Sequence, residues 1–156
     1  MHSFLYFWRA IFSNQILMGG VFGWFSAQFL KTILYAIINK EWDLSRFWGD
    51  GGMPSAHSST VSCMAVSAAI VCGPSSPVFA LAAILAFITM RDAMGVRLET
   101  GKQAVILNEL IRIFSPDNPS LPEERLKEFV GHTPTQVVAG GILGVAAAGL
   151  LNLFYM

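Results

Sequence analysis

The chain has 156 residues, a length that suits one domain and leaves little room for a second. Hydrophobic residues make up 54% of it and charged residues only 13%, about half of the ~25% that is usual in soluble globular domains. Ten basic and ten acidic residues balance, so no net charge attracts polyanions. This composition argues against a soluble enzyme, a disordered chain and a nucleic-acid-binding protein, and it predicts an integral membrane protein.

The expected elements are all helical. The aromatic segment before Asn14 is predicted to form a short interfacial helix, because aromatic side chains favour the headgroup level. Four later stretches are apolar over roughly the 20 residues that a bilayer-spanning helix needs. They cover residues 14–38, 54–72, 77–94 and 134–154. We therefore expect a single all-α membrane domain, a bundle of about four transmembrane helices.

The longest polar segment covers residues 95–133. Apolar residues spaced i, i+3, i+4 and i+7 between Leu107 and Phe114 predict an amphipathic helix from Leu98 to Phe114. The Pro-rich stretch at 115–119 ends this helix, and a short second helix is expected over residues 122–130.

The distribution of lysine and arginine predicts the topology. With four spans, Arg9 is the only one of the ten basic residues outside a single face of the membrane. The positive-inside rule then places the polar loops in the cytoplasm and both termini outside, in a multi-pass protein of the cell membrane.

Small residues four apart occur in the first and fourth predicted spans, at Gly19, Gly23, Gly140, Gly144 and Ala148. This spacing is typical of membrane helices that pack closely. We interpret these residues as packing positions without chemistry, which also leaves room for homo-oligomer contacts.

Two of the three histidines lie where a membrane helix is expected to begin. Pro54 follows two glycines, and His57 falls in the first turn of the next helix, whose unpaired N–H groups favour anions. His132 precedes the fourth span, with Thr133 as its expected N-cap. The alternative is that Ser55 merely caps its helix and His57 is an interfacial residue.

Three ionisable residues lie within or next to predicted spans, where charge is costly and is usually paired or functional. Asp92 and Arg97 lie at the end of the third span, and a stabilising ion pair between them is one interpretation. Lys31 lies in the first span, where it either extends to the headgroups or binds phosphate.

At the two helix starts the sequence resembles a known family. Pro54-Ser55-Ala56-His57 is similar to the Pro-Ser-Gly-His motif of type 2 phosphatidic acid phosphatases, which are relatives of vanadium haloperoxidases. The Gly-His-Thr-Pro run at 131–134 resembles their third motif. The divergent bacterial and plant branch of that family is similar over nearly the whole chain, in blocks that contain Gln28-x-x-Lys31, Gly51-Gly52-Met53-Pro54-Ser55, Asp92-Ala93-x-Gly95-Val96-Arg97, Gly101-x-Gln103-Ala104 and Leu107-Asn108.

The resemblance implies a phosphatase that acts on a lipid phosphate or diphosphate through a phosphohistidine, without a metal or other cofactor. By position, His132 would be the nucleophile and His57 the general acid, and an unperturbed imidazole pKa near ~6.5 suits both roles. Gln136 or Asp92 would orient the nucleophile. The remaining matched polar residues would bind substrate, namely Lys31, Ser55, Arg97, Gln103 and Asn108.

The chain also departs from the parent family. Gln136 stands where that family has an orienting Asp, and the Lys-x6-Arg-Pro motif is absent. These departures support an alternative, a non-catalytic protein that binds or transports lipid phosphates on the same scaffold. A third alternative is a purely structural membrane protein, and haloperoxidase activity is disfavoured.

Overall fold

The computed structural model describes residues 2–49, 51–114, 125–128 and 131–156. These residues form helices and no strands, as the all-α prediction requires. In chain order the elements are α1 (His2–Ser13), α2 (Gln15–Asn39), the 3-10 helix η1 (Leu44–Phe47), α3 (Ala56–Cys72), α4 (Pro77–Met94), α5 (Val96–Phe114) and α6 (Pro134–Tyr155).

Three helical stretches of the described chain are long and apolar enough to cross a membrane. They are Gln15–Asn39, Pro134–Tyr155 and Pro77–Phe114, the last of which combines α4 and α5. Helix α3 is apolar but shorter, with 17 residues. The fold is thus an all-helical membrane bundle, with three candidate spans and a shorter fourth helix among them.

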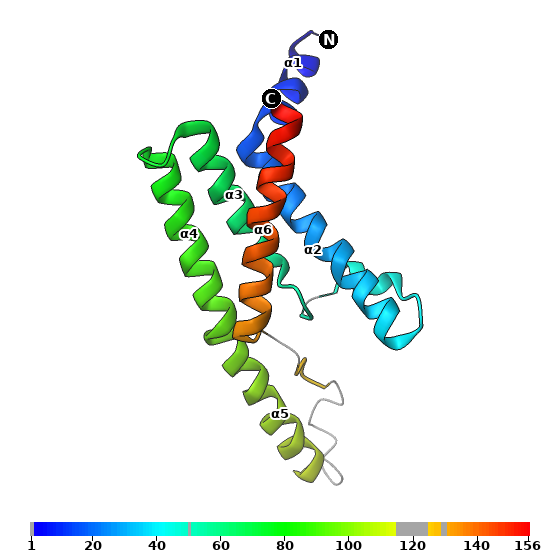
Figure 1. The fold of residues 1–156 in the computed structure, drawn as a ribbon. Coiled ribbons are helices and arrows are strands. Elements are labelled where there is room, and N and C mark those ends of the chain that lie inside the picture. The colour runs from blue at the N-terminus through cyan, green and yellow to red at the C-terminus, as the bar shows by residue number, and fades with distance from the viewer. Residues whose placement is uncertain (1, 50, 115–124, 129–130) are drawn as a thin grey trace.

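Helix α3 lies in the middle of the bundle and packs against α2, α4 and α6 (Figure 1). Both termini lie at one end, while the loop after α2 and helix α5 lie at the other. The polar segments that flank the two histidine-bearing helix starts are therefore at the same end of the bundle.

Glycines let α2 and α6 approach α3 closely. A Cβ at Gly23 would lie 2.7 Å from the Ser59 carbonyl oxygen, and one at Gly144 would collide with that same oxygen from the other side. The Ser59 hydroxyl donates to the Gly23 carbonyl at 2.7 Å across the α2–α3 contact. Ala148 is fully buried against Cys63. The interpretation of the small residues as helix-packing positions is confirmed.

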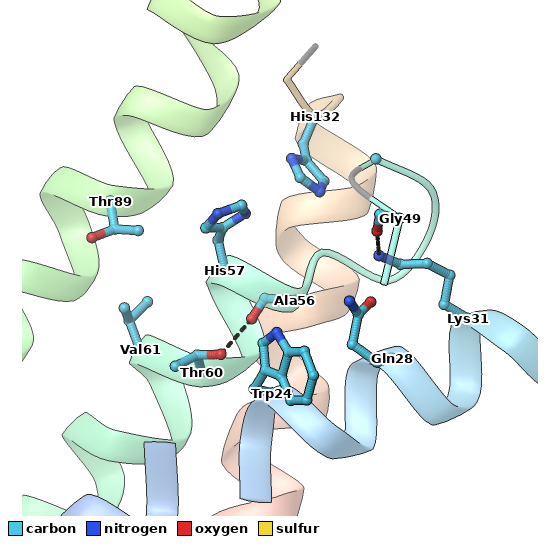
Figure 2. A pocket seen from close by; sticks show the side chains of 11 residues that line it. Trp24, Gln28, Lys31, Gly49, Ala56, His57, Thr60, Val61, Thr89 and His132 are labelled. Carbon is cyan, nitrogen blue, oxygen red and sulfur yellow. Dashed lines mark hydrogen bonds between the residues drawn. The ribbon is translucent and has the colours of Figure 1, made fainter. Parts of the chain in front are cut away.

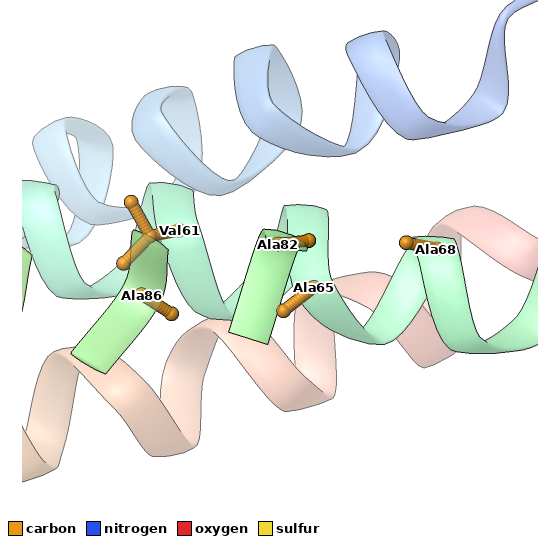
Figure 3. Packing of buried hydrophobic residues seen from close by; sticks show 5 residues of the cluster. All are labelled: Val61, Ala65, Ala68, Ala82 and Ala86. Atoms are coloured by element: carbon orange, nitrogen blue, oxygen red, sulfur yellow. The ribbon is translucent and has the colours of Figure 1, made fainter. Parts of the chain in front are cut away.

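Between α3 and α4 the core is also built from small side chains. Figure 3 shows this cluster, which consists of Val61, Ala65, Ala68, Ala82 and Ala86. Small residues permit close approach of helix backbones, which favours van der Waals packing in lipid, where burial of apolar surface gives little driving force. Large apolar side chains are instead exposed on the outside of the spans, for example Phe25, Leu81 and Ile142.

The loop after α2 folds back onto that helix. Phe47 lies with its ring centroid 5.6 Å from Trp24 and 5.3 Å from Phe25, and Trp48 lies 5.9 Å from Trp24. Asp43 caps η1, and its hydrogen bonds from Ser45 hold the pKa of the Asp43 carboxyl below its ordinary value. This aromatic packing holds the loop against the part of α2 that carries Trp24, close to the two histidines.

The amphipathic helix predicted from Leu98 to Phe114 is confirmed as α5, which begins at Val96, directly after Gly95 ends α4. Residues 125–128 are not helical, so the helix predicted over 122–130 is wrong there, and its other residues lie outside the described part. The reason is that Asn108 hydrogen-bonds both the N–H and the carbonyl of Leu126, each at 2.9 Å.

Candidate functional site

Two backbone hydrogen bonds bring the histidine-bearing helix starts together. The Ser55 N–H donates to the Gln136 carbonyl at 3.0 Å, which joins the start of α3 to the first turn of α6. The His132 N–H donates to the Ala93 carbonyl at 2.9 Å, which ties the segment before α6 to the last turn of α4. Three helix ends that are remote in sequence therefore meet at one point.

Ser55 is the N-cap of α3 and is fully buried. Its hydroxyl accepts from the Ser58 N–H at 3.3 Å and lies 3.1 Å from the Ser58 hydroxyl. Capping of this kind satisfies N–H groups that the first turn of a helix otherwise leaves unpaired. The structure thus gives Ser55 a capping role, while His57, two residues on, is carried into the cavity.

The His57 and His132 rings lie side by side, as Figure 2 shows. Their centroids are 5.6 Å apart and their planes meet at 83°. His132 is only 4% exposed. The two histidines that the sequence predicted at separate helix starts therefore form one pair.

The pair borders a cavity of about 240 Å³ between α2, α3 and α4. Lys31 is buried there, and its Nζ donates to the Gly49 carbonyl at 3.3 Å. Ala56 and His57 begin α3 at this cavity, so the positive end of the helix dipole faces it. A buried cation, two imidazoles and a helix N-terminus make an environment suited to an anion.

Several cavity-lining residues were missed in the sequence. Trp24 and Gln28 come from α2, Thr60 from α3 and Thr89 from α4. A signal for two of them was present, because Trp24, Gln28 and Lys31 are spaced four and three residues apart and so share one helix face. Thr60 and Thr89 carry no comparable signal in the sequence.

Asp92 and Arg97 do not line this cavity. The Arg97 Nε lies 2.9 Å from Asp92 Oδ2, and both side chains are about half exposed. This is the ion-pair alternative considered for the two residues. Arg97 as a phosphate ligand and Asp92 as the orienting carboxylate would both require this pair to rearrange.

Two other predicted substrate-binding residues lie on α5, outside the cavity lining. Asn108 holds Leu126 and also donates to a Glu128 carboxylate oxygen at 2.8 Å. Gln103 is exposed. Asn108 thus positions the chain segment that leads toward His132.

Gln136 takes part in a capping box at the start of α6. Its Oε1 accepts from the Thr133 N–H at 3.0 Å, while the Thr133 hydroxyl accepts from the Gln136 N–H at 3.4 Å. Such reciprocal bonds satisfy two N–H groups at a helix start. In this structure the Gln136 carboxamide oxygen is directed to the backbone beside His132.

Two substitutions at Gln136 test whether its side chain caps α6 or orients His132. If Gln136 is a cap, Gln136→Ala should reduce the free energy of unfolding by about 0.5–2 kcal/mol, while Gln136→Glu, which can keep the capping box, should not. Thermal unfolding in detergent measures both. An alanine variant that unfolds like the wild type but has lost function would show that Gln136 acts on His132 instead.

No group of three His, Cys, Asp or Glu side chains within the described ranges is close enough to hold a metal ion.

Comparison with known proteins places this chain in a family. Residues 12–147 match the model of the divergent PAP2 family. The chain is 35% identical to the uncharacterised membrane protein YuiD of Bacillus subtilis (strain 168), over 94% of this chain and 99% of that protein. No solved structure gives a significant match. The match covers both histidine-bearing helix starts and all of the cavity-lining residues named above, and the chain belongs to the divergent PAP2 family.

Proposed function

We propose that the protein is a membrane phosphatase that hydrolyses a lipid phosphate or diphosphate monoester. The observation that carries this proposal is the His57–His132 pair, 5.6 Å between centroids, at a cavity that also contains buried Lys31. Membership in the divergent PAP2 family supports a phosphatase-like scaffold. A site at the end of a membrane bundle suits an amphiphilic substrate whose tail stays in the bilayer.

The proposed reaction has two steps. A His132 imidazole nitrogen attacks phosphorus, the bond from phosphorus to the alcohol oxygen breaks, and that oxygen takes a proton from His57. Water then attacks phosphorus, giving a proton to His57, and the phosphorus–nitrogen bond breaks with its electron pair returning to His132. Inorganic phosphate leaves, and both histidines are restored. The ring centroids are 5.6 Å apart, so a single phosphoryl group beside the pair is the substrate that would engage both rings, one as nucleophile and one as acid.

The surrounding charges favour this transfer. The Lys31 ammonium and the N-terminal end of α3 provide positive potential where negative charge develops on the phosphoryl oxygens. Such groups act more strongly in a buried site than in water. We further propose that the site faces the cytoplasm of a cell membrane, because the basic loops flank it.

A second function, binding of a lipid phosphate without turnover, is favoured by a specific observation. Of the two cations assigned to phosphate, Lys31 lines the cavity whereas Arg97 is paired with Asp92 outside it. The Gln136 oxygen, which would orient the nucleophile, is bonded to the Thr133 N–H. Binding requires neither an oriented nucleophile nor a second cation.

A phosphate-release screen with purified protein distinguishes the two functions. We expect release from at least one of phosphatidic, isoprenyl and sphingoid phosphates, and an acid-labile phosphohistidine label that His132→Ala abolishes. Lipid binding that survives His132→Ala, with no release by the wild type from any of the three, would instead establish the binding function.

A further inference from the structure

Gln28 is a buried polar residue that the proposed mechanism does not use. It lies on α2 between Trp24 and Lys31, is 5% exposed and lines the cavity. Its Oε1 has no hydrogen-bond partner within the described part of the chain. Figure 2 shows its carboxamide directed toward the space between Lys31 and the two histidines.

Within the described residues, an unpartnered buried carboxamide oxygen such as Gln28 Oε1 is unusual both in this protein and in proteins generally. Buried side-chain polar atoms nearly always have a partner. The other glutamines within the bundle do: Gln15 donates to Asn152 at 3.0 Å, and Gln136 accepts from Thr133. In the described part of the chain, Gln28 thus has a buried acceptor without a partner, on a side chain that lines the cavity.

The position of Gln28 along α2 indicates which part of a ligand it meets. A helix rises 1.5 Å per residue, so Gln28 lies about 4.5 Å further from the loop end than Lys31, and Trp24 about 6 Å beyond Gln28. With the phosphoryl group at His57, His132 and Lys31, the first carbons after the ester oxygen are level with Gln28. The apolar tail then continues past Trp24 and Val61, which also line the cavity.

A fully ionised phosphate monoester offers Oε1 nothing to bind, because all of its terminal oxygens are acceptors. A partner for Oε1 must be an N–H or O–H group. We propose that Gln28 is a specificity-determining residue that selects lipid phosphates carrying a hydrogen-bond donor on the carbon next to the phosphoester carbon. This inference rests on the proposed function only in placing the phosphate at the histidine pair.

Three matched probes test it: hexadecyl phosphate, 2-hydroxyhexadecyl phosphate and 2-aminohexadecyl phosphate in detergent micelles. For the wild type we expect at least one donor-bearing probe to exceed hexadecyl phosphate in kcat/KM by about tenfold, because a site built around a polar group discriminates against an analogue that lacks its partner. The hydroxyl and amino probes show which donor is accepted. Gln28→Leu should reduce the ratio to about one, because leucine offers no acceptor to the donor of either probe.

Ser26→Ala is the matched control, because Ser26 is on the same helix and its hydroxyl donates to the Phe22 carbonyl rather than lining the cavity. It should keep the wild-type ratio. Gln28→Met, which keeps the side-chain length, replaces the leucine variant if that one does not fold. An unchanged ratio in the Gln28 variants, or an equal loss for all three probes, would overturn the inference.

The two proposals fail differently. If the wild type hydrolyses none of the probes or lipid phosphates, the proposed catalysis is wrong, and the same three probes are compared by their Kd in equilibrium binding. If a donor-bearing probe binds with a tenfold lower Kd than hexadecyl phosphate, and Gln28→Leu abolishes this difference, the role of Gln28 is supported. Equal Kd values for the three probes overturn it.

Discussion

Replacing His57 with alanine should slow the hydrolysis of alkyl phosphates by about 10²–10⁴-fold, the usual contribution of a general acid. The loss should be much smaller for an aryl phosphate, whose leaving oxygen needs no proton. His132→Ala should abolish hydrolysis of both, because it removes the nucleophile. Steady-state kinetics with the two substrate types separate the roles of the paired rings.

His2→Ala is the control for the histidine series, because α1 lies at the opposite end of the bundle from the site. It should keep wild-type kinetics with both substrates. If His57→Ala lost both activities equally while His132→Ala kept the aryl phosphate activity, the nucleophile would be His57 and the assigned roles would be reversed.

The second large effect is expected at the contact between α3 and α6. A Cβ at Gly140 would collide with the Ser55 carbonyl oxygen, and one at Gly144 with the Ser59 carbonyl oxygen. Both obstacles are backbone atoms, which cannot move aside as a flexible side chain can. Each glycine-to-alanine change should therefore reduce the free energy of unfolding by about 1–3 kcal/mol, measured by denaturation in detergent.

Gly149→Ala is the matched control on the same helix, because a Cβ there meets nothing within 4 Å. It should be neutral or slightly stabilising, since alanine has the higher helix propensity. Gly140→Ala should also reduce phosphate release, because it displaces Ser55 and with it the start of α3 that carries His57. A Gly140→Ala protein as stable as the Gly149→Ala protein would contradict this account of the helix contact.

The sequence predicted most of the fold because membrane helices leave strong local signals. Long apolar stretches, Pro at helix starts and glycines four apart are all readable within one segment. The helix predicted over 122–130 was wrong over residues 125–128 because a remote residue, Asn108, takes the backbone hydrogen bonds of Leu126. A local pattern contains no information about such a partner.

The candidate site could be predicted only in part, for the same reason. His57, His132 and Lys31 were found from helix-start patterns and family blocks, and all three line one cavity. Arg97 and Asp92 were equally plausible by pattern, yet they pair with each other outside that cavity. Arg97 lies outside the cavity because of the way in which α5 follows α4 at Gly95, and Lys31 is the cation that lines the cavity with the histidines.

The apolar composition and the few charges by themselves determined that this is a helical membrane protein with its polar residues gathered near helix ends. Only the tertiary structure decided that two histidines 75 positions apart in the sequence lie with their ring centroids 5.6 Å apart. Only it revealed that the Gln28 Oε1, near this pair, lacks a hydrogen-bond partner among the described residues. The physical reason is that helices form from local hydrogen bonds, whereas the site forms from contacts among α2, α3, α4 and the start of α6.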